Sequence, residues 1–136
     1  MFRSLINIVN FVSVFKFHFD QPTITLPSGT YKGTHLPPSP SIPHSQDLFL
    51  GIPYAQPPLG SLRFRPPRPV IPSNETHDAT AYSVSCVQSG PFSAGLQIGE
   101  DCLTLNVVRP SRYELDKLNV KKSGLPVLVS PCYELR

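Results

Sequence analysis

Proline is the residue that most constrains how this chain can fold. The sequence has 17 prolines among 136 residues. A proline ring fixes φ and removes a backbone N–H, so prolines are excluded from the interior of helices and from central strands. Long stretches must therefore be extended or turning, which excludes a helical bundle or a coiled coil. Because hydrophobic residues make up 40 % of the sequence and charged residues only 15 %, wholesale disorder is not expected, and the length suits one domain.

Alternating apolar and polar residues predict a β-rich structure between the proline segments. Residues 23–26 and 30–33 alternate on either side of a Pro27-Ser28-Gly29 turn, which predicts a β-hairpin. Residues 47–54 form a dense apolar strand. Gly51 in the middle of that strand predicts a bulge or a close backbone approach.

The second half of the chain is expected to contain two further strands. Residues 103–108 alternate as a strand that Arg109-Pro110 ends, and residues 125–129 form a short apolar run typical of a buried strand. Residues 78–82 are a short connector. Residues 111–124 are rich in lysine and serine and predict a polar loop.

Neither the charge nor the cysteines and histidines indicate a particular class of ligand. The net charge of +3 is too small and too scattered to predict a nucleic-acid partner. The three cysteines include no C-x-x-C pair and the four histidines have no ligand-like spacing, so we expect no metal site and no cofactor. If two of Cys86, Cys102 and Cys132 pair, one thiol is left over.

The first 20 residues differ from the rest of the chain. Arg3 precedes an apolar run from Leu5 to Phe15, which resembles the first two regions of a signal peptide. Asn7 and Asn10 interrupt the run and no A-x-A cleavage site follows, so a mispredicted start or a buried strand is the alternative. The run is too short to span a bilayer. We therefore treat residues 1–21 as a signal-like or mispredicted segment.

Three short motifs lie outside the predicted strands. Residues 63–69 fit the R-x-x-P-x-x-P pattern of a polyproline ligand, although the apolar strand beside them argues against an exposed linker. Ser93 in GPFSAG has one residue too many before it for a G-x-S-x-G nucleophile turn, and we interpret it as a loop serine. Asn74-Glu75-Thr76 is a sequon for N-glycosylation, a modification found on surface loops of secreted proteins.

Several longer blocks together resemble one protein family. FLGIPYAQPPLGSLRF at 49–64 resembles the F-x-G-I-P-Y-A-x-P-P-x-G-x-L-R-F block near the start of type-B carboxylesterases, which include the cholinesterases and fungal lipases. Residues 78–88 resemble the family's D-A-T-x-Y…C-x-Q stretch, and residues 99–107 resemble its E-D-C-L-x-L-N-V signature. LPVLV at 125–129 is similar to the strand that leads into the family's oxyanion loop. We therefore expect residues 22–129 to be the N-terminal part of a type-B carboxylesterase domain.

The resemblance implies an α/β hydrolase fold, to which this stretch contributes mostly β structure. The expected elements are N-terminal antiparallel edge strands of the sheet, with few or no helices. The resemblance also implies a disulfide between Cys86 and Cys102 and a structural salt bridge between Arg63 and Glu100. Asp101, beside them, is expected to hold backbone or an arginine rather than to act as an acid. Both a disulfide and an N-linked glycan require the secretory route, so an extracellular, secreted protein is expected.

The family's catalytic residues are missing from this sequence. After Val129 relatives continue into an aromatic-Ile-H-G-G-G loop that builds part of the oxyanion hole, whereas residues 130–136 form a non-family tail. The G-E-S-x-G nucleophile and the acid and histidine of the triad lie further on in relatives, so no catalytic residue is predicted here. The expected function is that of an N-terminal fragment of a carboxylic-ester hydrolase, inactive alone, as a truncated gene model would give. The full-length relative acts on ester or lipid substrates.

Two other functions are alternatives to this one. The first is a non-catalytic, cholinesterase-like binding or adhesion protein, and the second is a secreted proline-rich binding segment. The isolated chain is also expected to aggregate, since a few strands without the rest of their sheet expose a long edge.

Overall fold

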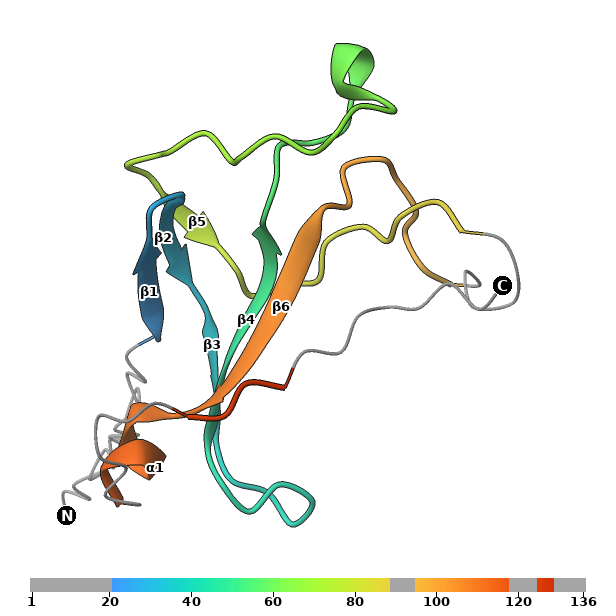
Figure 1. The fold of residues 1–136 in the computed structure, drawn as a ribbon. Helices are drawn as coiled ribbons and strands as arrows, with labels where there is room; N and C mark the ends of the chain where they lie inside the picture. Colours follow the sequence, from blue (N-terminus) through green and yellow to red (C-terminus); the bar gives the residue numbers. More distant parts are fainter. Residues whose placement is uncertain (1–20, 89–94, 118–124, 129–136) are drawn as a thin grey trace, which may run out of the picture.

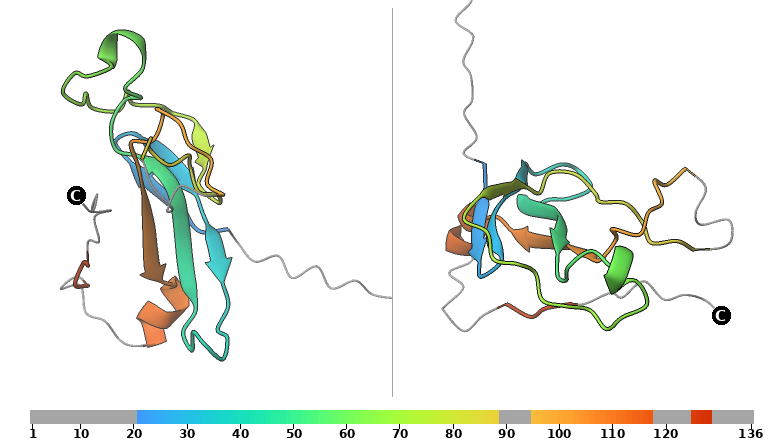
Figure 2. Two further views of the ribbon diagram at one scale, coloured as in Figure 1. Left: turned by 90° about the vertical axis from the view of Figure 1, so that its right-hand side faces the viewer. Right: turned by 90° about the horizontal axis from the view of Figure 1, so that it is seen from above.

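The computed structural model describes residues 21–88, 95–117 and 125–128, which form two small β-sheets (Figure 1). One sheet has the strand order β1-β2-β5 and the other the order β3-β4-β6. The η1 turn and α1 lie at opposite ends of the second sheet (Figure 2). No helix in the described part of the chain is long and apolar enough to cross a membrane. The elements in chain order are β1 (Thr23–Leu26), β2 (Gly29–Lys32), β3 (Thr34–Leu36), β4 (Gln46–Pro53), the 3-10 helix η1 (Gly60–Leu62), β5 (Thr76–Asp78), β6 (Thr104–Pro110) and α1 (Arg112–Lys117).

The β1-β2 hairpin forms where the alternating pattern predicts it. The strands pair antiparallel, with Leu26 opposite Gly29, and Gly29 has a φ of +140° that side chains with a Cβ rarely adopt. Tyr31 on β2 is 2 % exposed, and its hydroxyl donates a hydrogen bond to Ser28 Oγ at 3.1 Å. The predicted hairpin is confirmed.

Strand β4 is the central strand of the second sheet. Its residues Phe49 and Ile52 form the core cluster together with Tyr31 and Ala79. At Gly51 φ is +69°, and the pairing of β4 with β6 shifts register between Phe49 and Ile52. Gly51 N–H donates to Asn106 Oδ1 at 2.9 Å, which ties this β-bulge to β6. The bulge predicted from Gly51 is confirmed.

Gly33 allows the chain to pass from one sheet to the other. It lies between β2 and β3, and its N–H donates to Pro22 O at 2.8 Å. A Cβ at this position would overlap the Leu48 carbonyl oxygen and lie 2.7 Å from the Phe49 ring. Only glycine permits this approach of the crossover to β4, so the two sheets can share one core.

Strands β5 and β6 differ from the predicted boundaries. Asp78 belongs to β5 rather than to a connector, because β5 pairs in parallel with β2, a contact that no local pattern reveals. Strand β6 does not end before Arg109-Pro110 but includes both residues. Within the described residues β6 lies at the edge of its sheet, where the missing N–H of a proline is tolerated.

The segment after β6 also differs from the prediction. The expected polar loop at 111–124 contains the helix α1 at Arg112–Lys117. Residues 125–128, expected to begin a buried strand, have no strand geometry, and Val127 and Leu128 are 85 % and 95 % exposed. A buried strand needs partners for its backbone N–H and C=O groups, and no strand in the described part of the chain pairs with these residues.

Candidate functional site

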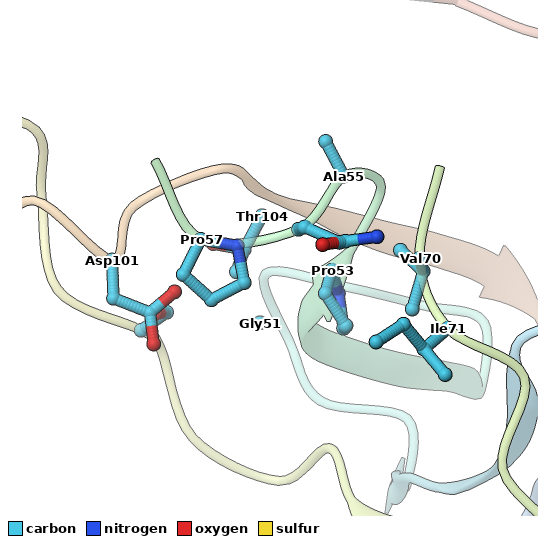
Figure 3. Close-up of a pocket in the computed structure, with 10 residues that line it drawn as sticks. Gly51, Pro53, Ala55, Pro57, Val70, Ile71, Asp101 and Thr104 are labelled. Atoms are coloured by element: carbon cyan, nitrogen blue, oxygen red, sulfur yellow. The ribbon is translucent and has the colours of Figure 1, made fainter. Parts of the chain in front are cut away.

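A hollow of about 380 Å³ lies at the C-terminal end of β4, beside the proline-rich segment that follows it (Figure 3). In Figure 3 the Asp101 carboxylate lies on one side of the hollow and the Val70 and Ile71 side chains on the other. The described lining includes one carboxylate but neither histidine nor cysteine, so it can enclose an apolar group but provides no nucleophile with its base. The lining residues are Gly51, Pro53, Ala55, Gln56, Pro57, Val70, Ile71, Ser83, Asp101 and Thr104.

The proline-rich wall of the hollow is fixed by hydrogen bonds from Gln56. Its backbone N–H donates to Arg68 O, and its side-chain amide donates to Pro69 O, both at 2.9 Å. These bonds close residues 57–67 into a loop that contains η1. Because prolines restrict φ in the unfolded chain as well, ordering this loop costs less conformational entropy than ordering a flexible one.

The residues assigned to a disulfide and a salt bridge are close together. Cys86 and Cys102 are disulfide-bonded, with their Cα atoms 5.0 Å apart. Arg63 Nη2 lies 2.6 Å from Glu100 Oε1, which links the η1 loop to the segment that the disulfide closes. Since the two side chains are 56 % and 37 % exposed, this ion pair contributes only about 0–1 kcal/mol. The disulfide is the stronger of the two links.

The other residues that the sequence analysis assigned are separate from this group. Asn74 is exposed in the bend before β5, where the adjacent Ser73 carbonyl approaches the β1-β2 turn at Gly29. Asp101 lines the hollow, and no catalytic role follows from its surroundings. Ser93 and Cys132 lie outside the described residues, as do residues 1–20 and the tail 130–136.

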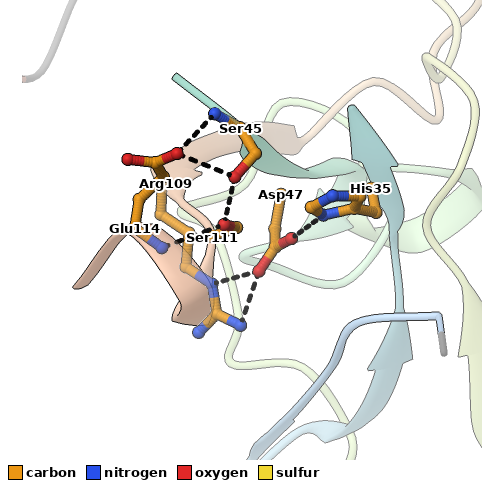
Figure 4. A network of polar contacts seen from close by, with 6 residues as sticks. All are labelled: His35, Ser45, Asp47, Arg109, Ser111 and Glu114. Atoms are coloured by element: carbon orange, nitrogen blue, oxygen red, sulfur yellow. Dashed lines mark hydrogen bonds and ion pairs between the residues drawn. The ribbon is translucent and has the colours of Figure 1, made fainter. Parts of the chain in front are cut away.

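A second polar cluster, which the sequence analysis missed, crosses the β3-β4-β6 sheet (Figure 4). His35, Asp47 and Arg109 lie directly opposite one another on the three strands. Asp47 Oδ1 accepts a hydrogen bond from His35 Nδ1 at 3.0 Å, and Oδ2 accepts from Arg109 Nη2 at 3.2 Å and Nε at 3.3 Å. Asp47 is 4 % exposed, so its buried carboxylate is paired on both sides. The Arg109 guanidinium also lies 5.2 Å from the centre of the Phe49 ring.

Helix α1 is attached to the start of β4 through its first turn. In a capping box, an N-cap serine binds the N–H of a glutamate three residues on, and the glutamate binds the serine's own N–H. Ser111 Oγ does accept from Glu114 N–H, at 3.4 Å. The Ser111 N–H, however, donates to Ser45 O at 3.0 Å, and the Ser45 N–H donates to Glu114 Oε1 at 3.4 Å. Ser45 therefore takes the place of the cap's own backbone and holds α1 on β4.

Glu114 is ionised in this arrangement. Burial raises the pKa of its carboxyl, but the hydrogen bond from the Ser45 N–H, the contact with His44 at 3.3 Å and the charge of Lys117 outweigh burial, so the pKa lies below the ordinary value. The Ser45 and Ser111 hydroxyl oxygens are 2.5 Å apart and, like Glu114, are at most 3 % exposed. A substrate cannot reach these groups, so Ser45, Ser111 and Glu114 position α1 rather than performing chemistry.

The contacts that hold α1 have a signal in the sequence, whereas the contacts across the sheet have none. Ser111-Arg112-Tyr113-Glu114 fits the S-x-x-E pattern of a capping box, which predicts a helix start inside the expected loop. His35, Asp47 and Arg109 have no such signal, because their contact depends on the register of three strands. Among the described residues no group of three or more His, Cys, Asp or Glu is arranged to hold a metal ion.

Comparison with known proteins identifies the family. The family model described as "Carboxylesterase family" matches residues 20–130. The chain belongs to this family. Its resemblance to type-B carboxylesterases, inferred above from the sequence blocks, is confirmed.

Individual members of the carboxylesterase family are clearly similar to the chain but much longer. It is 44 % identical to lipase 4 of Diutina rugosa over 86 residues (48 % of this chain), 38 % to carboxylesterase 5A of Felis catus over 94 residues (61 %), and 40 % to the cholinesterase of Mus musculus over 98 residues (64 %). The chain covers 16 % of the length of each of these relatives. The crystal structure of Aspergillus niger EstA matches 66 % of this chain and 16 % of its own, with a TM-score of 0.54 and 36 % identity.

The structural match confirms the expected fold class. The match to EstA supports the α/β hydrolase fold for this chain, whose described residues form six strands, the 3-10 helix η1 and one short α-helix. The chain therefore contributes mostly β structure to this fold, as the sequence predicts.

Proposed function

We propose that residues 22–129 are the N-terminal part of a carboxylic-ester hydrolase and that the 136-residue chain does not hydrolyse esters by itself. The observation that carries this proposal is the family match over residues 20–130 in a sequence that has neither a G-x-S-x-G turn nor an H-G-G-G loop. In the complete enzyme, which acts on carboxylic esters or lipids, this part has a structural role. It supplies edge strands, the segment closed by the Cys86–Cys102 disulfide, and the hollow beside Asp101.

Exposed apolar side chains support this role. Phe64 is 93 % exposed. Its φ of +59° costs a non-glycine residue about 1–3 kcal/mol, and within the described residues no contact of the exposed ring with a core offsets this cost. Val108 on β6 and the residues Val127 and Leu128 are also more than half exposed. We infer that the rest of the hydrolase domain packs on these side chains, and that without it the chain self-associates.

The first test is the activity of the chain alone. The purified 136-residue chain is incubated with p-nitrophenyl acetate and butyrate, and no turnover above buffer hydrolysis is expected. Ser93→Ala is the matched control, because Ser93 is the serine nearest to a nucleophile pattern. Turnover by the parent chain that Ser93→Ala abolishes would contradict the proposal.

The second test asks whether the segment can serve as part of an active esterase. It replaces the matched segment of Diutina rugosa lipase 4, and the rest of the lipase is left unchanged. The chimera is expected to hydrolyse p-nitrophenyl esters. A chimera carrying Gly33→Ala, whose new Cβ overlaps the Leu48 carbonyl oxygen, is the control for a misfolded segment. A soluble, folded chimera without turnover, beside an active parent lipase, contradicts the structural role.

We also propose that the protein is secreted. The Cys86–Cys102 disulfide supports this, since disulfides persist mainly in oxidising compartments, and the apolar run at 5–15 resembles the core of a signal peptide. When the chain is produced in eukaryotic cells, we expect it in the culture medium with two of its three thiols protected from alkylation before reduction. Retention in the cytosol with all three thiols free is the contrary result.

A further inference from the structure

The bend before β5 presents a complete sequon to solvent. Asn74-Glu75-Thr76 is the only N-x-S/T triplet in the sequence, and no proline interrupts it or follows it. All three side chains are exposed. An N-linked glycan on Asn74 would therefore displace no buried side chain.

The backbone beneath this triplet is held in place. Glu75 N–H donates to Ser73 Oγ at 3.1 Å, and Glu75 O accepts from Thr30 N–H of β2 at 3.4 Å. Two residues further on, the His77 ring stacks on Tyr31 with its centre 5.3 Å away. The sequon thus lies on a fixed corner beside the β1-β2 turn, with its side chains directed away from the core.

We propose that Asn74 is an N-glycosylation site, a proposal that rests on the secretory route proposed above. A sequon on a surface bend of a disulfide-bonded chain meets the requirements of this modification, which are the acceptor triplet, access and passage through an oxidising lumen. A glycan at this corner also has a structural consequence. It keeps the Asn74 corner in solvent in the complete protein, so the remaining domain must pack elsewhere, on the faces that carry Phe64, Val127 and Leu128.

The test is translation of the full chain in the presence of endoplasmic-reticulum microsomes. Two forms are compared, one with the chain's own N-terminus and one preceded by a cleavable signal peptide from a secreted protein. For the second form we expect a protease-protected product with a mass increment of one glycan that peptide N-glycosidase removes. Asn74→Gln and Thr76→Ala should lose the increment, whereas Thr76→Ser, which preserves the triplet, should retain it.

The two forms separate this inference from the secretory proposal. A protected but unglycosylated product of the signal-bearing form overturns the assignment of Asn74, whatever the other form does. Glycosylation of that form, together with exclusion of the other form from the microsomes, supports Asn74 as an acceptor and contradicts secretion by the chain's own N-terminus. Because Asn74 is exposed, the Asn74→Gln chain should still form the Cys86–Cys102 disulfide, read from its mobility on non-reducing gels.

Discussion

Replacing Asp47 by asparagine tests the ladder of polar side chains that His35, Asp47 and Arg109 form across β3, β4 and β6. The change keeps the size of the side chain but removes the negative charge that His35 and Arg109 share. Asparagine offers its oxygen to Arg109 and its NH₂ group to His35 Nδ1, which must then accept instead of donating, so both hydrogen bonds lose their charged acceptor. The strands themselves are retained, and the variant is expected to fold with reduced stability.

The size of the effect follows from the exposure of the three side chains. Removing one partner of a fully buried ion pair costs about 3–5 kcal/mol, and a hydrogen bond to a charged group contributes about 1.5–3 kcal/mol. The Asp47 side chain is 5 % exposed, but those of His35 and Arg109 are 22 % and 37 % exposed, so water can solvate them once the carboxylate is gone. We therefore expect Asp47→Asn to lower the free energy of unfolding by about 1.5–3 kcal/mol.

Urea unfolding of the oxidised chain at pH 7 provides the measurement, at a dilution at which light scattering shows a monomer, because the chain is expected to self-associate. With an m-value of about 2 kcal/mol per molar, the expected loss lowers the midpoint by roughly 1 M. Arg109→Met removes the cation but keeps an apolar stem near the Phe49 ring, so the double variant gives the coupling between Asp47 and Arg109, expected at about 1 kcal/mol. Arg68→Met, at an exposed arginine, is the matched control. A midpoint for Asp47→Asn that equals the parent's, with no coupling to Arg109, would refute this reasoning.

Two further perturbations test the links between distant segments. The pKa of Glu114 is lowered in the folded state, so its stabilising contribution is complete above its ordinary pKa of 4.5 and is lost as the pH falls through the lowered value. The stability difference between the parent and Glu114→Gln should therefore shrink as the pH is taken below 4.5, and a difference that does not vary with pH contradicts the ionised cap. Replacing Cys86 and Cys102 together by serine opens a loop spanning 16 residues and should cost about 3 kcal/mol in urea unfolding; a midpoint equal to that of the oxidised parent would contradict the predicted weight of this disulfide.

Local patterns were sufficient to predict the hairpin and β4. In both, the alternation of side chains, a proline or glycine turn and the bulge at Gly51 act within a few residues of one another. Strand β5 has only three residues and no such pattern, since its geometry comes from pairing with β2 more than 40 positions earlier. Helix α1 had a local signal in Ser111 and Glu114, but the abundance of lysine and serine around it favoured a loop.

The candidate site, too, could be predicted only in part. Spacing alone could not decide which two of three cysteines pair, and the Cys86–Cys102 assignment depended on the family resemblance. The His35–Asp47–Arg109 ladder was not predictable, because a shift of one residue in either strand pairing would move Asp47 to the opposite face of the sheet.

The apolar run at 125–128 shows what a sequence pattern can and cannot specify. Its composition indicates that these side chains are suited to burial, yet Val127 and Leu128 remain 85 % and 95 % exposed. Burial requires a covering surface, and composition does not say where that surface lies in the chain. This chain covers only 16 % of the length of the matched relatives, which are therefore about six times longer than the part it covers. The exposed run, the strained Phe64 and the edge of β6 are accordingly the places where a partner segment should change the structure most. If Val127 and Leu128 stayed exposed after such a domain was added, the result would argue against packing on these two side chains.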